Sequence, residues 1–216
     1  MKNSRLYLNV PYSEKDEAKS LGARWNPERK EWYVDNSKIY HLFEKWYYNQ
    51  EANGILHDYI YIATANRTCF KCNNQTQVIA LASPDSTYID EDGGIIEENS
   101  MDFFCYINYL PENLSKFLKE KYNFYYEYSN HTKSFYYGNH CNHCGSLQGE
   151  NYLHNEIDGV FNVLNMFINQ NAKNITLYRL NLSEAIQIGY EEISSSSIID
   201  DGQLLLEYKE IKDLFI

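Results

Sequence analysis

The sequence has few of the residues that mark disordered, fibrous or membrane-spanning chains. Among 216 residues there are 10 glycines and 4 prolines, and 44% are hydrophobic, which excludes collagen-like and low-complexity chains. No run approaches the roughly 20 apolar residues that a membrane helix needs. The first five residues lead into a short alternating segment without the apolar core of a signal peptide. We therefore expect a globular, cytoplasmic protein with no membrane partner.

Positive charge is also scarce. The chain has 19 Lys and Arg against 30 Asp and Glu, a net charge of −11. Binding to phosphate backbones is driven largely by counterion release, so an acidic chain is a poor general polyanion binder. Residues 1–33 differ, with seven basic and five acidic residues, which leaves −13 for the remainder. Any nucleic-acid contact must therefore be local, and the acidic remainder suits a basic protein partner.

Recognisable catalytic motifs are missing. The sequence contains no GxSxG, GxxxxGK[ST], HExxH or strand-linked GxGxxG pattern. No HxE triplet precedes a CxxC pair, as a zinc deaminase would require. We interpret the acidic run Asp90-Glu91-Asp92 as a solvated loop. These absences favour a non-enzymatic protein, with an enzyme of unrecognised site as the less favoured hypothesis.

Five cysteines are present, and their spacing is the most specific signal in the chain. Four form two CxxC pairs, Cys69–Cys72 and Cys141–Cys144, with 68 residues between them. In a reducing compartment such pairs indicate a metal site, because disulfides do not persist there. Two CxxC loops complete a tetrahedral zinc site with four thiolate ligands. Asn73 and Gly145, which follow the pairs, both tolerate the left-handed backbone of such turns.

Other uses of the cysteines stay open. One CxxC at a helix N-terminus is typical of a redox pair, and four thiolates also hold iron–sulfur clusters. We favour Zn²⁺ with a structural role, since four thiolates leave no position for water or substrate. His140 and His143 are interpreted as ordinary polar neighbours of the second pair. Cys105 lies in an apolar, strand-like run and is predicted to be a buried hydrophobe.

The N-terminal region has the pattern of a small strand–helix–hairpin module. Residues 5–10 alternate in hydrophobicity, which predicts a strand with Leu6, Leu8 and Val10 on one face. Ser13 is predicted to cap a short helix that Gly22 ends. A turn at residues 26–27 then opens a hairpin. We predict that its tryptophans, Trp25 and Trp32, pack across the strands and are at least partly buried; a platform on which bases stack is the alternative.

The same stretch carries a family resemblance. Residues 7–34 read YLNVPYSEKDEAKSLGARWNPERKEWYV. This closely resembles a module of unknown function, written YLNVPxxEKDxAKxLGARWDPxxKxWYV, in plasmid primase, conjugation and other mobile-element proteins. The match covers about residues 5–35, and Asn26 stands for the usual Asp. The resemblance implies contact with single-stranded or forked DNA, and we assign that contact to four basic residues: Lys19, Arg24, Arg29 and Lys30.

Beyond the module, Ser37 is predicted to cap a helix through Gln50, with Ile39, Leu42, Phe43 and Trp46 facing inward. The remaining expected elements alternate between strands and a few helices. Strands are expected at 55–63, 76–82, 101–110, 124–128, 133–137, 176–180 and 185–188, helices at 112–122 and 158–168, an exposed loop at 84–100, a polar spacer at 194–197 and an unassigned strand or helix at 203–216.

The stretch 139–154 resembles the zinc-ribbon-like body that follows this module in uncharacterised bacterial proteins. The expected fold class is therefore α+β: a small module over residues 1–50, and a zinc-stapled, mainly antiparallel β domain with few helices over 51–216. The favoured function is a non-enzymatic, zinc-binding accessory protein that contacts DNA through its module. The alternative is an acidic regulator of a plasmid, phage or other mobile element that binds a host or phage protein through a tyrosine-rich surface; the chain has 21 tyrosines.

Overall fold

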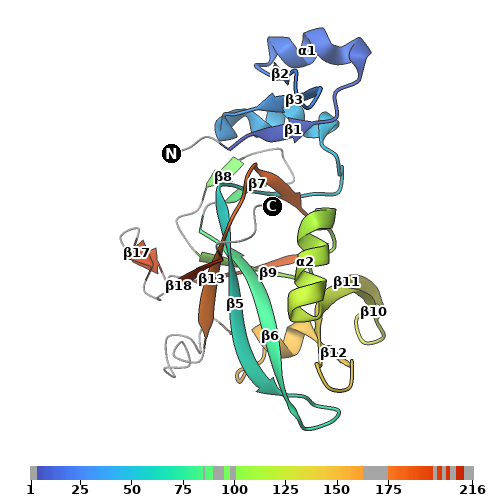
Figure 1. Ribbon diagram of the computed structural model, residues 1–216, viewed down its shortest axis with the longest axis vertical. Helices are drawn as coiled ribbons and strands as arrows, with labels where there is room; N and C mark the ends of the chain where they lie inside the picture. Colours follow the sequence, from blue (N-terminus) through green and yellow to red (C-terminus); the bar gives the residue numbers. More distant parts are fainter. Residues whose placement is uncertain are drawn as a thin grey trace.

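The computed structural model describes residues 4–84, 86–89, 95–97, 101–162, 175–196, 199–200, 203–204 and 208–211. Most strands pair in antiparallel fashion and helices are few, so the predicted α+β class is confirmed. The N-terminal module lies at one end of the molecule, and the turn between the two longest strands, β5 and β6, lies at the other (Figure 1). Within these described residues, no helix is long and apolar enough to cross a membrane.

The module consists of short elements around a small antiparallel sheet of order β1-β3-β2. In chain order these are β1 (Leu6–Leu8), the 3-10 helix η1 (Tyr12–Glu14), α1 (Lys15–Ser20), β2 (Arg24–Asn26), β3 (Glu31–Val34) and the 3-10 helix η2 (Ser37–Trp46). The predicted cap at Ser13 is wrong, because Ser13 lies inside η1 and no side chain caps α1. Gly22 follows α1 with a φ of 110°, which supports its predicted stop.

The last element of the module corrects a second prediction. It is a 3-10 helix that ends at Trp46, and Asn36, not Ser37, caps it by accepting a hydrogen bond from the Lys38 N–H. A 3-10 helix has three residues per turn. Tyr40, Phe43 and Trp46 therefore share the buried face, whereas Leu42, which the α-helical pattern placed inward, is 41% exposed.

The module packs onto the body that follows it. Its hydrophobic cluster includes Leu6, Phe43 and Trp46, and the body contributes Ile55 and Ala185 to it. Leu6 also forms an isolated parallel bridge with Ala185. The module core is therefore completed by side chains from outside residues 5–47.

The body is built on a six-stranded sheet of order β15-β9-β6-β5-β13-β18, with a four-stranded sheet, β14-β4-β7-β8, and a three-stranded sheet, β10-β11-β12. Its strands are β4 (Gly54–Leu56), β5 (Tyr59–Thr68), β6 (Gln75–Ser83), β7 (Ser86–Ile89), β8 (Ile95–Glu97), β9 (Met101–Cys105), β10 (Phe124–Ser129), β11 (Ser134–His140), β12 (Leu147–Gln148), β13 (Thr176–Asn181), β14 (Ile186–Ile188), β15 (Glu192–Ser196), β16 (Ile199–Asp200), β17 (Gln203–Leu204) and β18 (Tyr208–Ile211). Its helices are α2 (Glu112–Tyr122), which matches the predicted range, and α3 (Glu150–His154).

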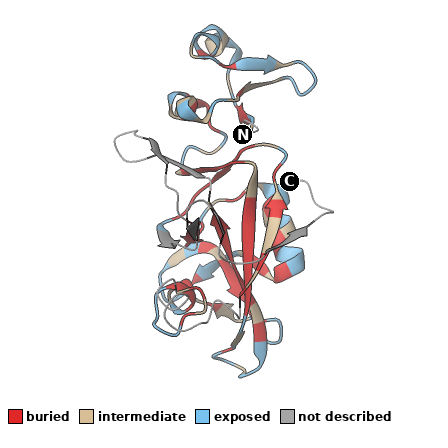
Figure 2. Ribbon diagram, turned by 90° about the vertical axis from the view of Figure 1, so that its left-hand side faces the viewer, coloured by how far each residue is buried: buried red, intermediate tan, exposed pale blue. Residues whose placement is uncertain are grey.

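Both faces of the central hairpin β5–β6 are buried, as Figure 2 shows for the middle of the body. Ile62 and Leu81 face the side covered by α2, where Leu114 and Leu118 belong to the same cluster. Alternate residues of these strands face the other side, with Leu153 of α3. Because successive side chains of a strand point to opposite faces, the near-continuous apolar runs of β5 and β6 are what a sheet covered on both sides requires.

Several predicted segments differ from the structure. The expected loop over 84–100 contains β7 and β8, and the spacer over 194–197 lies largely in β15, which pairs with β9. Residues 158–162 of the expected helix form turns, and the rest of that helix, like the acidic run 90–92, lies outside the described residues. Strands on the edge of a sheet gain their hydrogen bonds from distant partners, so polar runs such as Ser194–Ser196 give no local signal.

Candidate metal centre

The two CxxC pairs lie in two hairpin turns, one between β5 and β6 and one between β11 and β12. Each turn closes in the same way: the Cys69 N–H donates to the Asn74 carbonyl and the Cys141 N–H to the Ser146 carbonyl, both at 2.9 Å. Asn73 and Gly145 have φ values of 58° and 70°. These are the left-handed positions that the sequence predicts, and they let each chain reverse directly after its second cysteine.

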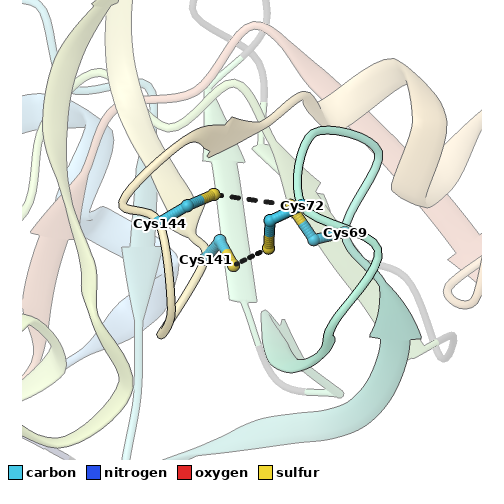
Figure 3. A group of neighbouring side chains, drawn as sticks. All are labelled: Cys69, Cys72, Cys141 and Cys144. Carbon is cyan, nitrogen blue, oxygen red and sulfur yellow. Dashed lines mark hydrogen bonds between the residues drawn. The ribbon is translucent and has the colours of Figure 1, made fainter.

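The fold brings the two turns together. All four sulfurs, of Cys69, Cys72, Cys141 and Cys144, lie within 4.8 Å of one another and point into a common space (Figure 3). Two sulfur–sulfur distances are 3.8 Å (Cys69 to Cys144) and 3.7 Å (Cys72 to Cys141). A disulfide needs about 2.05 Å, whereas a tetrahedral ion with metal–sulfur bonds of about 2.3 Å has edges of about 3.8 Å. The four cysteines therefore form a possible metal site.

Polar groups around the sulfurs complete the site. The N–H groups of Lys71 and His143 donate to the sulfurs of Cys69 and Cys141, each at 3.4 Å. The Ser146 hydroxyl lies 3.4 Å from the Cys69 sulfur and 3.2 Å from that of Cys144, and the Gln148 amide donates to Cys69 at 3.5 Å. Such hydrogen bonds orient ligands and stabilise thiolates. The CxxC spacing located the sulfurs but missed Ser146 and Gln148.

The pKa values of the cysteines respond to the close approach of the four sulfurs. Burial on its own raises the pKa of Cys69, but hydrogen bonds from Ser146 and from backbone N–H groups outweigh it and lower that pKa to about 5. At Cys72 the Asn74 backbone lowers the pKa, but desolvation and the other three sulfurs outweigh it and raise the pKa to about 11. Four thiolates this close repel one another unless a cation lies between them. The donor set fits a single thiophilic ion.

The two histidines near the second pair have other partners. His140 is fully buried, stacks on Tyr125 with ring centroids 3.6 Å apart, and its Nε2 lies 2.7 Å from the Glu127 carboxylate. The His143 Nε2 lies 3.0 Å from the Gln75 carbonyl. Neither ring belongs to the four-sulfur group.

The four basic residues assigned to DNA are all exposed on the module but differ in their surroundings. Arg24, on β2, forms an ion pair with Asp35 at 2.8 Å, and its side chain is 64% exposed. Arg29 pairs with Glu31 at 2.8 Å and with Glu184 of the body. Lys19 ends in solvent on α1, and Lys30 occupies a left-handed turn position with a φ of 57°.

A row of cationic and aromatic side chains crosses the module sheet. Arg24 and Tyr7 are the register partners of Tyr33 on its two sides, so the three side chains share one face. The Arg5 guanidinium lies 4.7 Å from the Tyr33 ring centroid, and that of Arg29 lies 3.8 Å from the Tyr7 centroid. Cations stacked on rings are a surface on which nucleobases can also stack.

The two tryptophans of the hairpin differ in burial. Trp25 and Trp32 are register partners, and their rings meet edge to face at 5.5 Å. Trp32 packs against the module core, whereas Trp25 is 48% exposed and therefore only half-buried. Trp25 lies on the edge strand β2, which among the described residues has a strand neighbour on one side only.

Comparisons with known proteins relate the module to a family and to two named proteins. Residues 5–47 match a family described as a domain of unknown function, DUF5710. Two Escherichia coli proteins named DNA primase TraC are 56% and 51% identical to this chain over 45 residues, which is 21% of this chain and 3% and 4% of the primases. The predicted relation to a module of plasmid primases is thereby confirmed. No solved structure matches the chain.

Proposed function

We propose that this protein is a zinc-stapled accessory factor of a mobile genetic element that binds single-stranded or forked DNA through its N-terminal module. The observation that carries the proposal is the cationic and aromatic face of Arg5, Tyr33 and Arg24 on a segment that is more than half identical to part of two DNA primases. Single-strand binding combines cations for phosphates with rings for bases. The face offers both.

The four basic residues contribute unequally in this proposal. The Arg24–Asp35 pair is exposed, and exposed ion pairs contribute little, so Arg24 can exchange its partner for a phosphate. Lys19 and Lys30 are exposed as well. Arg29 would have to leave two carboxylates, Glu31 and Glu184. We therefore assign the phosphate contacts first to Arg24, Lys30 and Lys19, and only then to Arg29.

The cysteine centre has a structural role in this proposal. We assign Zn²⁺ to the four thiolates of Cys69, Cys72, Cys141 and Cys144. In a [2Fe–2S] cluster two cysteines bind each iron, and the sulfurs on different irons stand further apart. Here all four sulfurs lie within 4.8 Å of one another, which favours one tetrahedral ion. Four protein ligands leave no position for a substrate, and the ion fixes the β5–β6 turn to the β11–β12 turn.

A titration tests the DNA contact. Labelled single-stranded, duplex and forked DNA are titrated with the full chain at two salt concentrations. We expect preference for single-stranded or forked DNA, with a salt slope of about 0.7 per phosphate neutralised on a single strand. Arg24→Glu combined with Lys30→Glu should abolish binding. The matched control is Lys116→Glu, an exposed lysine on α2 of the body. Equal, negligible binding of all three DNAs at low salt would remove the proposal.

The second candidate, a protein-binding regulator, is favoured by one surface. On the β10–β11 hairpin, Tyr126, Tyr128 and Phe135 are 48%, 39% and 54% exposed. The Phe135 ring centroid lies 5.7 Å from that of Tyr126 and 5.0 Å from that of Tyr128. Clustered exposed aromatic side chains are typical of protein interfaces. A partner that co-purifies with the tagged protein after nuclease treatment, and is lost in Tyr126→Ser combined with Phe135→Ser, would favour this candidate over DNA binding.

A further inference from the structure

A second group of metal-ligating side chains lies in the core of the body, and the four-cysteine centre does not use it. Cys105 ends β9, while Glu150 and His154 are the first and last residues of α3. These three residues are 1%, 4% and 2% exposed. One ligand atom from each lies within 4.8 Å of the other two. A thiol, a carboxyl group and an imidazole thus meet in a site almost without solvent.

The local fold explains why they meet. Residues four apart on a helix lie on the same face, so Glu150 and His154 both point to the side of α3 that packs on the sheet. Tyr106, directly after Cys105, has a φ of 50°, and the chain turns away from β9 there. Cys105 therefore lies at the end of its strand, close to Glu150 and His154 of α3.

The group lacks hydrogen-bond partners that buried polar atoms normally have. Within the described part of the chain, Glu150 Oε1, His154 Nδ1 and His154 Nε2 have none. The Glu150 Oε2 and His154 Nε2 atoms are 3.5 Å apart, which is too long for a good hydrogen bond but close to the edge of about 3.3 Å between oxygen and nitrogen ligands of one tetrahedral ion. Buried polar atoms without partners require an explanation, and a cation bound by one atom from each of the three residues would provide one.

Burial disfavours the charged forms of these three side chains. Desolvation raises the pKa of Glu150 to about 8 and lowers that of His154 to about 4. Desolvation likewise raises the pKa of Cys105, so its thiol is a poor nucleophile. A divalent cation reverses these preferences, since it binds the carboxylate, the neutral imidazole and the thiolate.

We propose that Cys105, Glu150 and His154 form a second zinc site, with three protein ligands and a fourth position open to water or a small ligand. Sulfur, nitrogen and oxygen donors together suit Zn²⁺. Glu150 also lines a cavity of about 680 Å³ between the second CxxC turn and the β10–β11 turn, with Ser146 and Tyr152 in its wall. The ion therefore lies at the inner wall of a cavity, unlike the closed four-cysteine centre.

The test counts zinc in the full chain. After dialysis against excess Zn²⁺ and removal of loosely bound ions, we expect two zinc ions per wild-type chain. Cys105→Ala and His154→Ala should each keep one. His131→Ala, which changes another residue of the cavity wall, is the matched control and should keep two. One ion in the wild type would overturn the proposal, and Glu150 and His154 would then form an uncharged pair.

Cobalt provides a second measurement, because its absorption reports which side chains bind the ion as well as how many ions are bound. In Co²⁺-loaded wild type, five thiolates contribute charge-transfer absorption, four from the cysteine centre and one from Cys105. Cys105→Ala is a small change at a buried position, and it should remove about one fifth of this absorption and one of two binding steps. An unchanged Co²⁺ titration of folded Cys105→Ala would overturn the proposal. Failure of DNA binding leaves both measurements unaffected.

Discussion

The module and the body reach a buried core in opposite ways. Apart from Ala185, the module's cluster comes from residues 6–55 of the sequence, so packing follows closely on chain order. The body's central sheet joins strands from Tyr59 to Ile211, and strands β5 and β13, neighbours in the sheet, are more than a hundred residues apart. Closing such contacts costs more chain entropy. A staple is therefore more valuable in the body than in the module.

The four cysteines lie where a bound ion would offset this cost in chain entropy. Cys69 and Cys72 lie at the turn of β5–β6, and Cys141 and Cys144 in the turn that follows β11. One ion held by these four cysteines would close the 68-residue segment between the pairs and would fix the three-stranded sheet against the end of the central hairpin. The module, at the other end of the molecule (Figure 1), has no part in this site.

Removing one thiolate should therefore have the largest effect. In Cys141→Ser we expect loss of zinc from the four-cysteine centre and unfolding of the body, because structural zinc contributes about 10–16 kcal/mol in small domains, as much as a typical domain's whole stability. Zinc analysis and hydrogen exchange measure both. Amides of β5, β6 and β11 should lose protection, and those of β1 and β3 should lose less.

The control for this experiment lies in the same turn. His143→Ala changes a side chain that contacts the Gln75 carbonyl and no sulfur, so zinc content and exchange should stay as in the wild type. An unperturbed melting curve for Cys141→Ser would show that the body does not depend on the ion. Equal loss of protection in module and body would show that they unfold as one unit.

Core truncation in the module should have the second largest effect. Trp46 is 1% exposed, and its indole N–H donates to the Glu14 carboxylate at 2.6 Å. Trp46→Ala should cost about 3–5 kcal/mol, measured by denaturant unfolding. Trp25, at 48% exposure, keeps an edge-to-face contact with Trp32, so Trp25→Ala should cost about 1 kcal/mol. If both substitutions cost the same unfolding free energy, Trp25 contributes to stability as a core residue does.

The tryptophans Trp25 and Trp32 also show which features of the fold can be predicted from the sequence. Cross-strand pairing of Trp25 and Trp32 follows from the turn at Asn26-Pro27 and is present. Their burial depends on which strand lies at the edge of the sheet, and no local pattern tells this. The helix type of η2 likewise depends on packing and not on the local sequence. Residues 37–46 fit three and 3.6 residues per turn almost equally well over so short a length, and packing of Tyr40 against the body decides.

For the candidate site, the spacing of the cysteines predicts the four sulfur ligands but not the groups around them. Two CxxC pairs, each followed by a residue suited to a left-handed turn, located four sulfurs that the structure brings together. Ser146 and Gln148 lie outside that pattern, because their role depends on the pairing of β12 with β11. The apolar run around Cys105 predicts a buried side chain, and its burial is confirmed. Its proximity to Glu150 and His154 depends on how α3 packs, although their spacing of four residues was a signal.

The smallest expected effect is at the ion pair that joins the two regions. The side chains of Arg29 and Glu184 are 44% and 27% exposed, so a double-mutant cycle of Arg29→Met and Glu184→Gln should give a coupling of about 0.2–1 kcal/mol that falls with added salt. Denaturant unfolding measures it. If Arg29 takes part in DNA binding, Glu184→Gln alone should raise DNA affinity several-fold, because the Arg29 guanidinium then has to break only its ion pair with Glu31 to reach a phosphate. Unchanged affinity would show that Arg29 only holds the module to the body, and that Arg24, Lys30 and Lys19 make the contact without it.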